Sequence, residues 1–202
     1  MSDKIQPANA IPNLSGARKA GEQTENLDPA RADYKKGREH LKNGDLAEAA
    51  ACFHNALQGF EEQGDNQGVA NALDRLGDVC FDRGELSMAL SHYERCRQIC
   101  KEFKDPDSVF TLNQKIVNTL WRTGERSRAL STCFDILDHF HACNNPQGSV
   151  EILDTIATLY LEMGKKSDAA DAYRTIASIH KNFGHKRLAE QNLEKAAAAE
   201  KE

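Results

Sequence analysis

The sequence predicts an all-α protein, a right-handed α-solenoid of four helix-turn-helix repeats followed by a C-terminal capping helix. The main observation is a period of forty residues, at which four glycines recur with an alanine five residues after each. The glycines are Gly44, Gly84, Gly124 and Gly164, and the alanines are Ala49, Ala89, Ala129 and Ala169. A constant period without insertions is typical of stacked arrays, in which each repeat packs mainly on its neighbours.

The array is predicted to begin at residue 28. Residues 1–27 are rich in Pro, Gly, Asn, Ser and Gln and show little apolar periodicity, so we expect them to be disordered. Asp28 and Pro29 then form a helix start, because aspartate is a good N-cap and proline is tolerated in the first helical position.

Similar start signals recur in phase with the glycines and divide the array into hairpins. Asp65, Asp105 and Asn145 each open a first helix, and proline follows the last two. A second start lies just after each glycine, most clearly at Asp45, where Glu48 would complete a capping box. The predicted repeats, within residues 28–185, are 28–64, 65–104, 105–144 and 145–185.

The helices predicted between these signals are amphipathic. In the second helix of the first repeat, apolar residues keep the i, i+3, i+4, i+7 spacing of a single stripe. These residues are Leu46, Ala49, Ala50, Phe53, Ala56, Leu57 and Phe60. No strand pattern is present. Residues 186–202 are strongly helical and carry many polar residues, so we expect a capping helix with a polar outer side.

Composition excludes several classes of function. The 202 residues are 40% hydrophobic and 28% charged with a net charge of -5, which allows a folded core. No basic stripe favours nucleic acid, and no apolar run is long enough for a signal peptide or a membrane span. We therefore expect a cytoplasmic protein that binds neither nucleic acid nor membrane, with its six cysteines as free thiols.

The repeat resembles a known family. Gly37, Gly44, Ala49, Phe53 and Ala56 are similar to the tetratricopeptide-repeat signature, and the second repeat copies it. The later repeats depart from it, with Val117 and Ala157 at the first glycine and Cys133 at the aromatic position. The forty-residue unit resembles the long-helix subclass found in kinesin light chain and LGN-type adaptors. HEAT and armadillo arrays have similar lengths but lack the glycine and alanine pattern.

The resemblance implies a concave groove lined by the first helix of each repeat. The implied groove residues are Tyr34, Arg38, Leu41 and Lys42 in the first repeat, Asp74, Asp78, Phe81 and Asp82 in the second, Gln114, Asn118, Trp121 and Arg122 in the third, and Asp154, Thr158, Leu161 and Glu162 in the fourth. Such a groove would be basic at its start and acidic from the second repeat on, with apolar steps at Phe81, Trp121 and Leu161.

This layout suits a partner segment that is amphipathic and carries basic residues. Asp74, Asp78 and Asp82 lie four residues apart, and like charges at this spacing cost a few tenths of a kcal/mol each. A basic partner would offset that cost, whereas the plainer interpretation is a solvated helix face. Trp121, the only tryptophan, is equally consistent with a groove anchor and with packing against the next repeat.

The sequence therefore favours a non-enzymatic adaptor that binds a peptide or helix of another protein. Two alternatives remain, a self-assembling array in which the acidic face meets Arg38 and Lys42 of another copy, and a dedicated secretion or assembly chaperone. No catalytic or cofactor motif is present. His92, Cys96 and Cys100 share one helix face but span about 12 Å, too far for one metal ion, so we expect buried thiols instead.

Overall fold

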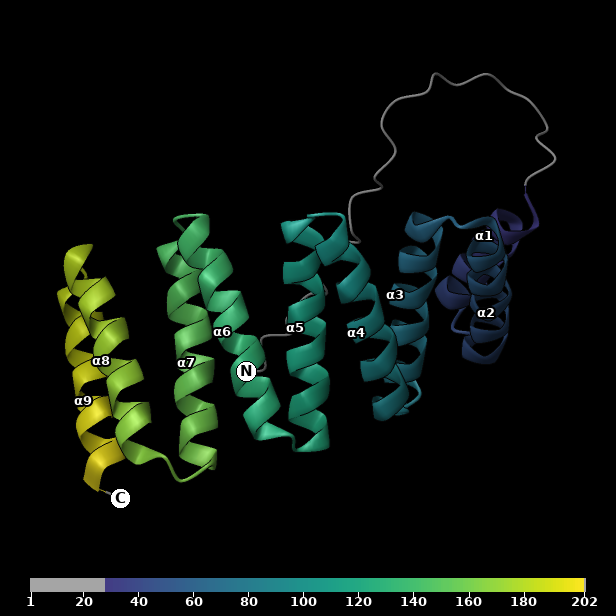
Figure 1. Ribbon diagram of the computed structural model, residues 1–202. Coiled ribbons are helices and arrows are strands. Elements are labelled where there is room, and N and C mark those ends of the chain that lie inside the picture. The colour runs from purple at the N-terminus through teal and green to yellow at the C-terminus, as the bar shows by residue number, and fades with distance from the viewer. Residues whose placement is uncertain (1–27, 202) are drawn as a thin grey trace.

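The structure is a computed structural model that describes residues 28–201. The predictions for residues 1–27 and for the last residue of the cap lie outside these residues. Within them the chain forms nine α-helices and no strand, arranged as successive hairpins in a right-handed α-solenoid (Figure 1). The helices are α1 (Pro29–Asn43), α2 (Leu46–Gln63), α3 (Asn66–Asp82), α4 (Leu86–Glu102), α5 (Pro106–Thr123), α6 (Arg126–Ala142), α7 (Pro146–Glu162), α8 (Lys166–Asn182) and α9 (Lys186–Lys201). The predicted fold class is confirmed.

The repeated glycines form the turn inside each hairpin, as predicted. Gly44 has φ 85°, in the left-handed region that glycine enters at no steric cost. The backbone N–H of Gly44 donates to the carbonyl of Leu41, and the N–H of Asp45 donates to the carbonyl of His40. These bonds satisfy carbonyls at the end of α1 and reverse the chain into α2.

Three of the predicted helix caps are formed, and two are not. The side chains of Asp65, Asp105 and Asn145 each accept a hydrogen bond from the backbone N–H three residues later. Asp28 makes no such bond, and its Oδ1 instead accepts from Nε2 of Gln63 at 2.6 Å. The predicted capping box at Asp45 is wrong, because its carboxylate makes no cap bond and Oδ2 lies 3.5 Å from Nδ1 of His40.

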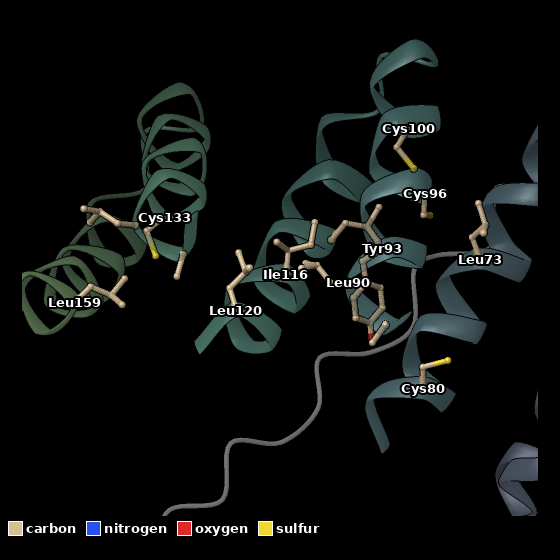
Figure 2. Close-up of a cluster of buried hydrophobic side chains, with 14 of the residues drawn as sticks. Leu73, Cys80, Leu90, Tyr93, Cys96, Cys100, Ile116, Leu120, Cys133 and Leu159 are labelled. Carbon is tan, nitrogen blue, oxygen red and sulfur yellow. The ribbon is translucent and has the colours of Figure 1, made fainter. Parts of the chain in front are cut away.

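The core runs along the array between the helices, and Figure 2 shows part of it. In the first two repeats, an aromatic ring of the second helix packs against a glycine of the first helix. A Cβ added at Gly37 would lie 2.8 Å from the ring of Phe53, and one at Gly77 would lie 2.4 Å from the ring of Tyr93. In the third repeat the same two positions hold Val117 and the smaller Cys133. In this repeat the larger residue on the first helix is thus accompanied by a smaller one on the second.

Candidate protein-binding face

The candidate site is the surface formed by the side chains of α1, α3, α5 and α7, which we call the first-helix face. At three of the four junctions between successive first helices, polar side chains join one helix to the next at an offset of 41 residues. The joined pairs are Tyr34 with Arg75, Asp74 with Lys115, and Asp154 with Lys195. We call this row of contacts the inter-repeat ladder. The third member of the row would be Gln114 with Thr155, which carries no charge.

The strongest part of the ladder surrounds Asp74, which is only 1% exposed. Lys115 Nζ donates to Asp74 Oδ1 at 2.6 Å and to Asp78 Oδ1 at 2.7 Å. Arg75 lies 2.9 Å from Asp74 Oδ2, an ion-pair contact without hydrogen-bond geometry, and donates to Asp78 Oδ2 at 3.1 Å. The hydroxyl of Tyr93 also donates to Asp78 Oδ1, at 2.9 Å. Two carboxylates are thus held by two cations.

The pKa values in this cluster are shifted by burial and by the neighbouring charges. Burial raises the pKa of the Asp74 carboxyl, and the ammonium of Lys115 opposes that shift. Burial lowers the pKa of Arg75, but Asp74 and Asp78 outweigh it and raise the pKa. Burial and the Asp78 carboxylate raise the pKa of the Tyr93 phenol far above its ordinary value. The tyrosine therefore stays protonated and keeps donating its hydrogen bond.

The burial of Asp74 does not agree with the expectation that it is an exposed groove residue. The repulsion between Asp74 and Asp78 is offset inside the chain by Lys115 and Arg75, so no partner is needed to explain it. Sequence reasoning missed Lys115 because it considered charges along one helix and not between helices. The available signal was the offset, since Lys195 stands 41 residues after Asp154 as Lys115 does after Asp74.

The rest of the second repeat is more open. Asp82 is exposed, and Phe81 is partly buried under the guanidinium of Arg122, whose Cζ lies 4.5 Å from the ring centroid. Burial and the nearby Asp78 raise the pKa of the Asp82 carboxyl, and Arg122 opposes this shift. In the second repeat, the predicted acidic stretch is therefore reduced to one exposed carboxylate with a cation nearby.

In the third repeat, Gln114 and Asn118 are exposed amides on α5. Trp121 is partly buried and packs against the core. Arg126 Cζ lies 5.1 Å from its ring centroid, and Nη1 of the same arginine donates to the Trp121 carbonyl at 2.6 Å. Arg126 also pairs with Glu162 of α7. Trp121 therefore has a packing role beside the fourth repeat, and its use as a binding anchor stays a prediction.

The two ends of the face differ from its centre. In the first repeat Arg38 and Lys42 are exposed, Leu41 is partly buried, and Tyr34 packs with its ring centroid 5.5 Å from that of Phe53.

In the fourth repeat Leu161 is exposed, and the hydroxyl of Thr158 donates to the Asp154 carbonyl. Lys195 Nζ donates to Asp154 Oδ1 at 3.0 Å, but both side chains are about half exposed. This pair contributes much less than a buried one.

Comparison with known proteins identifies the repeat. Residues 23–102 match a family model described as tetratricopeptide repeat. These 80 of the 202 residues are similar to tetratricopeptide repeats. Comparison with curated protein sequences gives no match.

Solved structures with a similar fold are distant in sequence. The apo form of RapI has a TM-score of 0.68 at 16% identity, over 85% of this chain and 49% of RapI. Aspartyl phosphate phosphatase F from Bacillus subtilis has a TM-score of 0.60 at 12% identity, over 84% of this chain and 45% of the phosphatase. BtubC from P. vanneervenii has a TM-score of 0.53 at 15% identity, over 85% of this chain and 88% of BtubC. The chain spans about half the length of the first two, and these identities show the fold alone.

The helical core holds most of the cysteines. All six are free, and Cys96 donates to the carbonyl of Ala70 at 3.2 Å. Burial raises the pKa of the Cys133 thiol to about 12. Among residues 28–201, no group of three or more His, Cys, Asp or Glu side chains is placed to hold a metal ion. None of the described helices has the length and apolar character needed to span a membrane, and the cytoplasmic location stays a prediction.

Proposed function

We propose that the protein is a non-enzymatic adaptor whose first-helix face binds a peptide or helical segment of another protein. The observation that supports this most is the uncharged step of the inter-repeat ladder between α5 and α7. Among the described residues, Gln114 and Asn118 make no side-chain hydrogen bond within the chain. Their amides are therefore free to donate to and accept from the backbone of a bound segment.

Binding at this step costs less than binding elsewhere on the face. A partner that covered Asp74 and Lys115 would have to compete with a compensated cluster and dehydrate it. At the uncharged step it would instead meet amides, the hydroxyl of Thr158 and the exposed Leu161. Burial of an apolar side chain on Leu161 would contribute affinity, and the amides would set the position of the segment.

The partner chemistry follows from the residues around this step. Leu161 and the exposed part of Trp121 favour an apolar side chain, and the exposed carboxylate of Asp82 favours a basic residue. A Rap protein with this fold has been solved in complex with competence and sporulation factor, with a TM-score of 0.54 at 16% identity over 88% of this chain and 53% of the Rap chain. That complex supports a binding role for the fold.

The test replaces the two free amides. The double variant Gln114→Ala and Asn118→Ala should keep its helical content and lose capture of the native partner, measured by affinity purification and quantitative mass spectrometry. Asn55→Ala is the matched control, because Asn55 is an exposed amide on α2, away from the first-helix face. Capture that is equal in all three proteins would overturn the proposal. Asp78 is unsuitable for this test, since its replacement also removes the contacts with Lys115 and Tyr93.

Self-assembly is the weaker candidate. It required free carboxylates to meet Arg38 and Lys42 of another copy, whereas Asp74 and Asp78 already pair within the chain. Light scattering over a range of protein and salt concentrations distinguishes the two functions, because a strict monomer at low salt excludes assembly through opposite charges. A dedicated chaperone would instead copurify with one aggregation-prone client.

A further inference from the structure

Helix α9 has the position of a first helix in the array. It follows α7 by forty residues, and its Lys195 pairs with Asp154 as Lys115 pairs with Asp74. Leu193 and Ala197 of α9 therefore correspond to Leu153 and Ala157 of α7. Figure 1 shows α9 at the C-terminal end of the row, next to α8. The residue types at the two positions are identical, so the two helices can be compared directly.

The exposure of these positions differs sharply between the two helices. In α7, which packs on its second helix α8, Leu153 is 6% exposed and Ala157 is fully buried. In α9, Leu193 is 52% exposed and Ala197 is exposed as well. Among residues 28–201, no second helix covers α9. The predicted polar outer side of this cap is therefore wrong at Leu193, whose apolar equivalents Leu73 and Leu153 are buried.

The residues around Leu193 specify the charge of a complementary surface. Glu190 and Glu194 are exposed, and neither has an ion-pair partner among the described residues. Of the other charges on α9, Lys195 pairs with Asp154 and Glu200 pairs with Arg174, while the exposed Lys186 and Arg187 lie one turn before Glu190. Glu190 and Glu194 are therefore the free charges nearest to Leu193 in the sequence. This surface thus combines an apolar centre with free carboxylates, which favours a ligand with apolar and basic side chains.

The array also shows which apolar group fits. In the first two repeats, the second helix places an aromatic ring against the small residue of the first helix, as Tyr93 does on Gly77. Ala197 stands at this register position in α9. The matching second helix for an alanine there is α8, which carries Tyr173 in the same register with Ala157. Its last turn holds the basic residue Lys181, at the end that an antiparallel helix places beside Glu190 and Glu194.

We propose that the open face of α9 binds an amphipathic helix of a partner protein, antiparallel to α9, with an aromatic side chain over Ala197 and basic residues toward Glu190 and Glu194. A second copy of the chain cannot supply such a helix from α2, α4, α6 or α8, because each already packs on its own first helix. Two α9 helices are also poor partners, since α9 has no aromatic residue and a symmetric pair would bring the same carboxylates together. This surface is separate from the uncharged step proposed above.

The probe is a fluorescein-labelled peptide with the sequence of α8, Lys166–Asn182, titrated against the full chain and followed by anisotropy. Saturable binding is expected, weak in absolute terms because a short helix must order on binding. Leu193→Glu should weaken it by about tenfold or more, and replacement of Tyr173 in the peptide should do the same. Ala198→Glu is the matched control, because Ala198 is exposed on another side of α9 and receives the same charge.

Three results would overturn the proposal. These are no binding to the unmodified chain, equal losses in Leu193→Glu and Ala198→Glu, and a concentration-dependent dimer that Leu193→Glu dissociates, which would identify a second copy as the occupant. Circular dichroism checks that each variant keeps its helical content. The variant with Gln114→Ala and Asn118→Ala should bind the peptide normally, so failure of either proposal leaves the other testable.

Discussion

Replacement of Lys115 by methionine tests whether the cluster at Asp74 stabilises the junction between the second and third repeats. Lys115 is 26% exposed and, among residues 28–201, is the only cation that donates hydrogen bonds to both Asp74 and Asp78. Two unit charges about 4 Å apart interact by roughly 4 kcal/mol at an effective dielectric of 20. Loss of one partner from a buried pair costs about 3–5 kcal/mol.

The expected loss is at or slightly below the lower limit of that range. Arg75 stays within 2.9 Å of Asp74 and retains part of the compensation, and the partly exposed ammonium of Lys115 gives up some hydration in the folded state. We therefore expect Lys115→Met to lower the free energy of unfolding by about 2–3 kcal/mol. Urea denaturation followed by circular dichroism measures this. Hydrogen exchange of the amides in α3 and α5 shows whether the loss lies at this junction, because repeat arrays can open locally.

The repeat supplies its own control. Lys195→Met removes the equivalent pair with Asp154, but there both side chains are about half exposed, so the loss should not exceed about 0.5 kcal/mol. Equal losses in the two variants would refute the reasoning, because burial of Asp74 would then contribute nothing.

The pH dependence of the free energy of unfolding is a second test of the cluster around Asp74. The folded-state pKa of Asp74 is raised, so this group favours folding at low pH, and that contribution declines as the pH rises from 3.8 through the folded pKa. Lys115 lowers that pKa, and its removal raises the pKa further. The difference in unfolding free energy between the wild type and Lys115→Met should therefore be smaller at about pH 4 than at about pH 7.

Two further predictions concern the core. Gly77→Ala places a Cβ 2.4 Å from the ring of Tyr93 and should cost about 2 kcal/mol in urea denaturation, although helix propensity alone favours alanine by about 1 kcal/mol; a neutral or stabilising result would mean that the ring moves freely. Burial raises the pKa of Cys133 to about 12, so iodoacetamide at about pH 8 should alkylate the exposed Cys143 and leave Cys133 unmodified until the chain is unfolded, as peptide mass spectrometry would show.

The local features of the fold could be read from the sequence because their chemistry is local. The turn at Gly44 depends on one residue with positive φ, and the cap at Asn145 depends on a side chain and an amide three residues apart. Asp45 failed as a capping box for an equally local reason, since its carboxylate faces His40. Rules based on spacing therefore predict a helix cap correctly when no other nearby side chain, such as His40 beside Asp45, binds the capping carboxylate.

The errors arose where contacts join helices that are far apart in sequence. The partner of Asp74 stands 41 residues later, an offset that follows from how first helices stack and not from any single helix. The exposure of Leu193 is a similar case. A helical pattern shows that one side of α9 is apolar, but whether a second helix covers that side depends on what packs there.

For each charged residue on a repeated face, its ion pairs within the chain have to be considered before a role in partner binding is proposed. The ladder ties charged residues into the junctions at Asp74 and Asp154, and these residues are then less available to a partner. At the junction between α5 and α7, Gln114 and Thr155 hold the equivalent positions, and Arg126 with Glu162 makes the ion pair instead. A partner can therefore bind Gln114 and its neighbours without breaking a stabilising pair. In arrays of this kind, a charge with an opposite charge 41 residues away should first be tested for its contribution to stability.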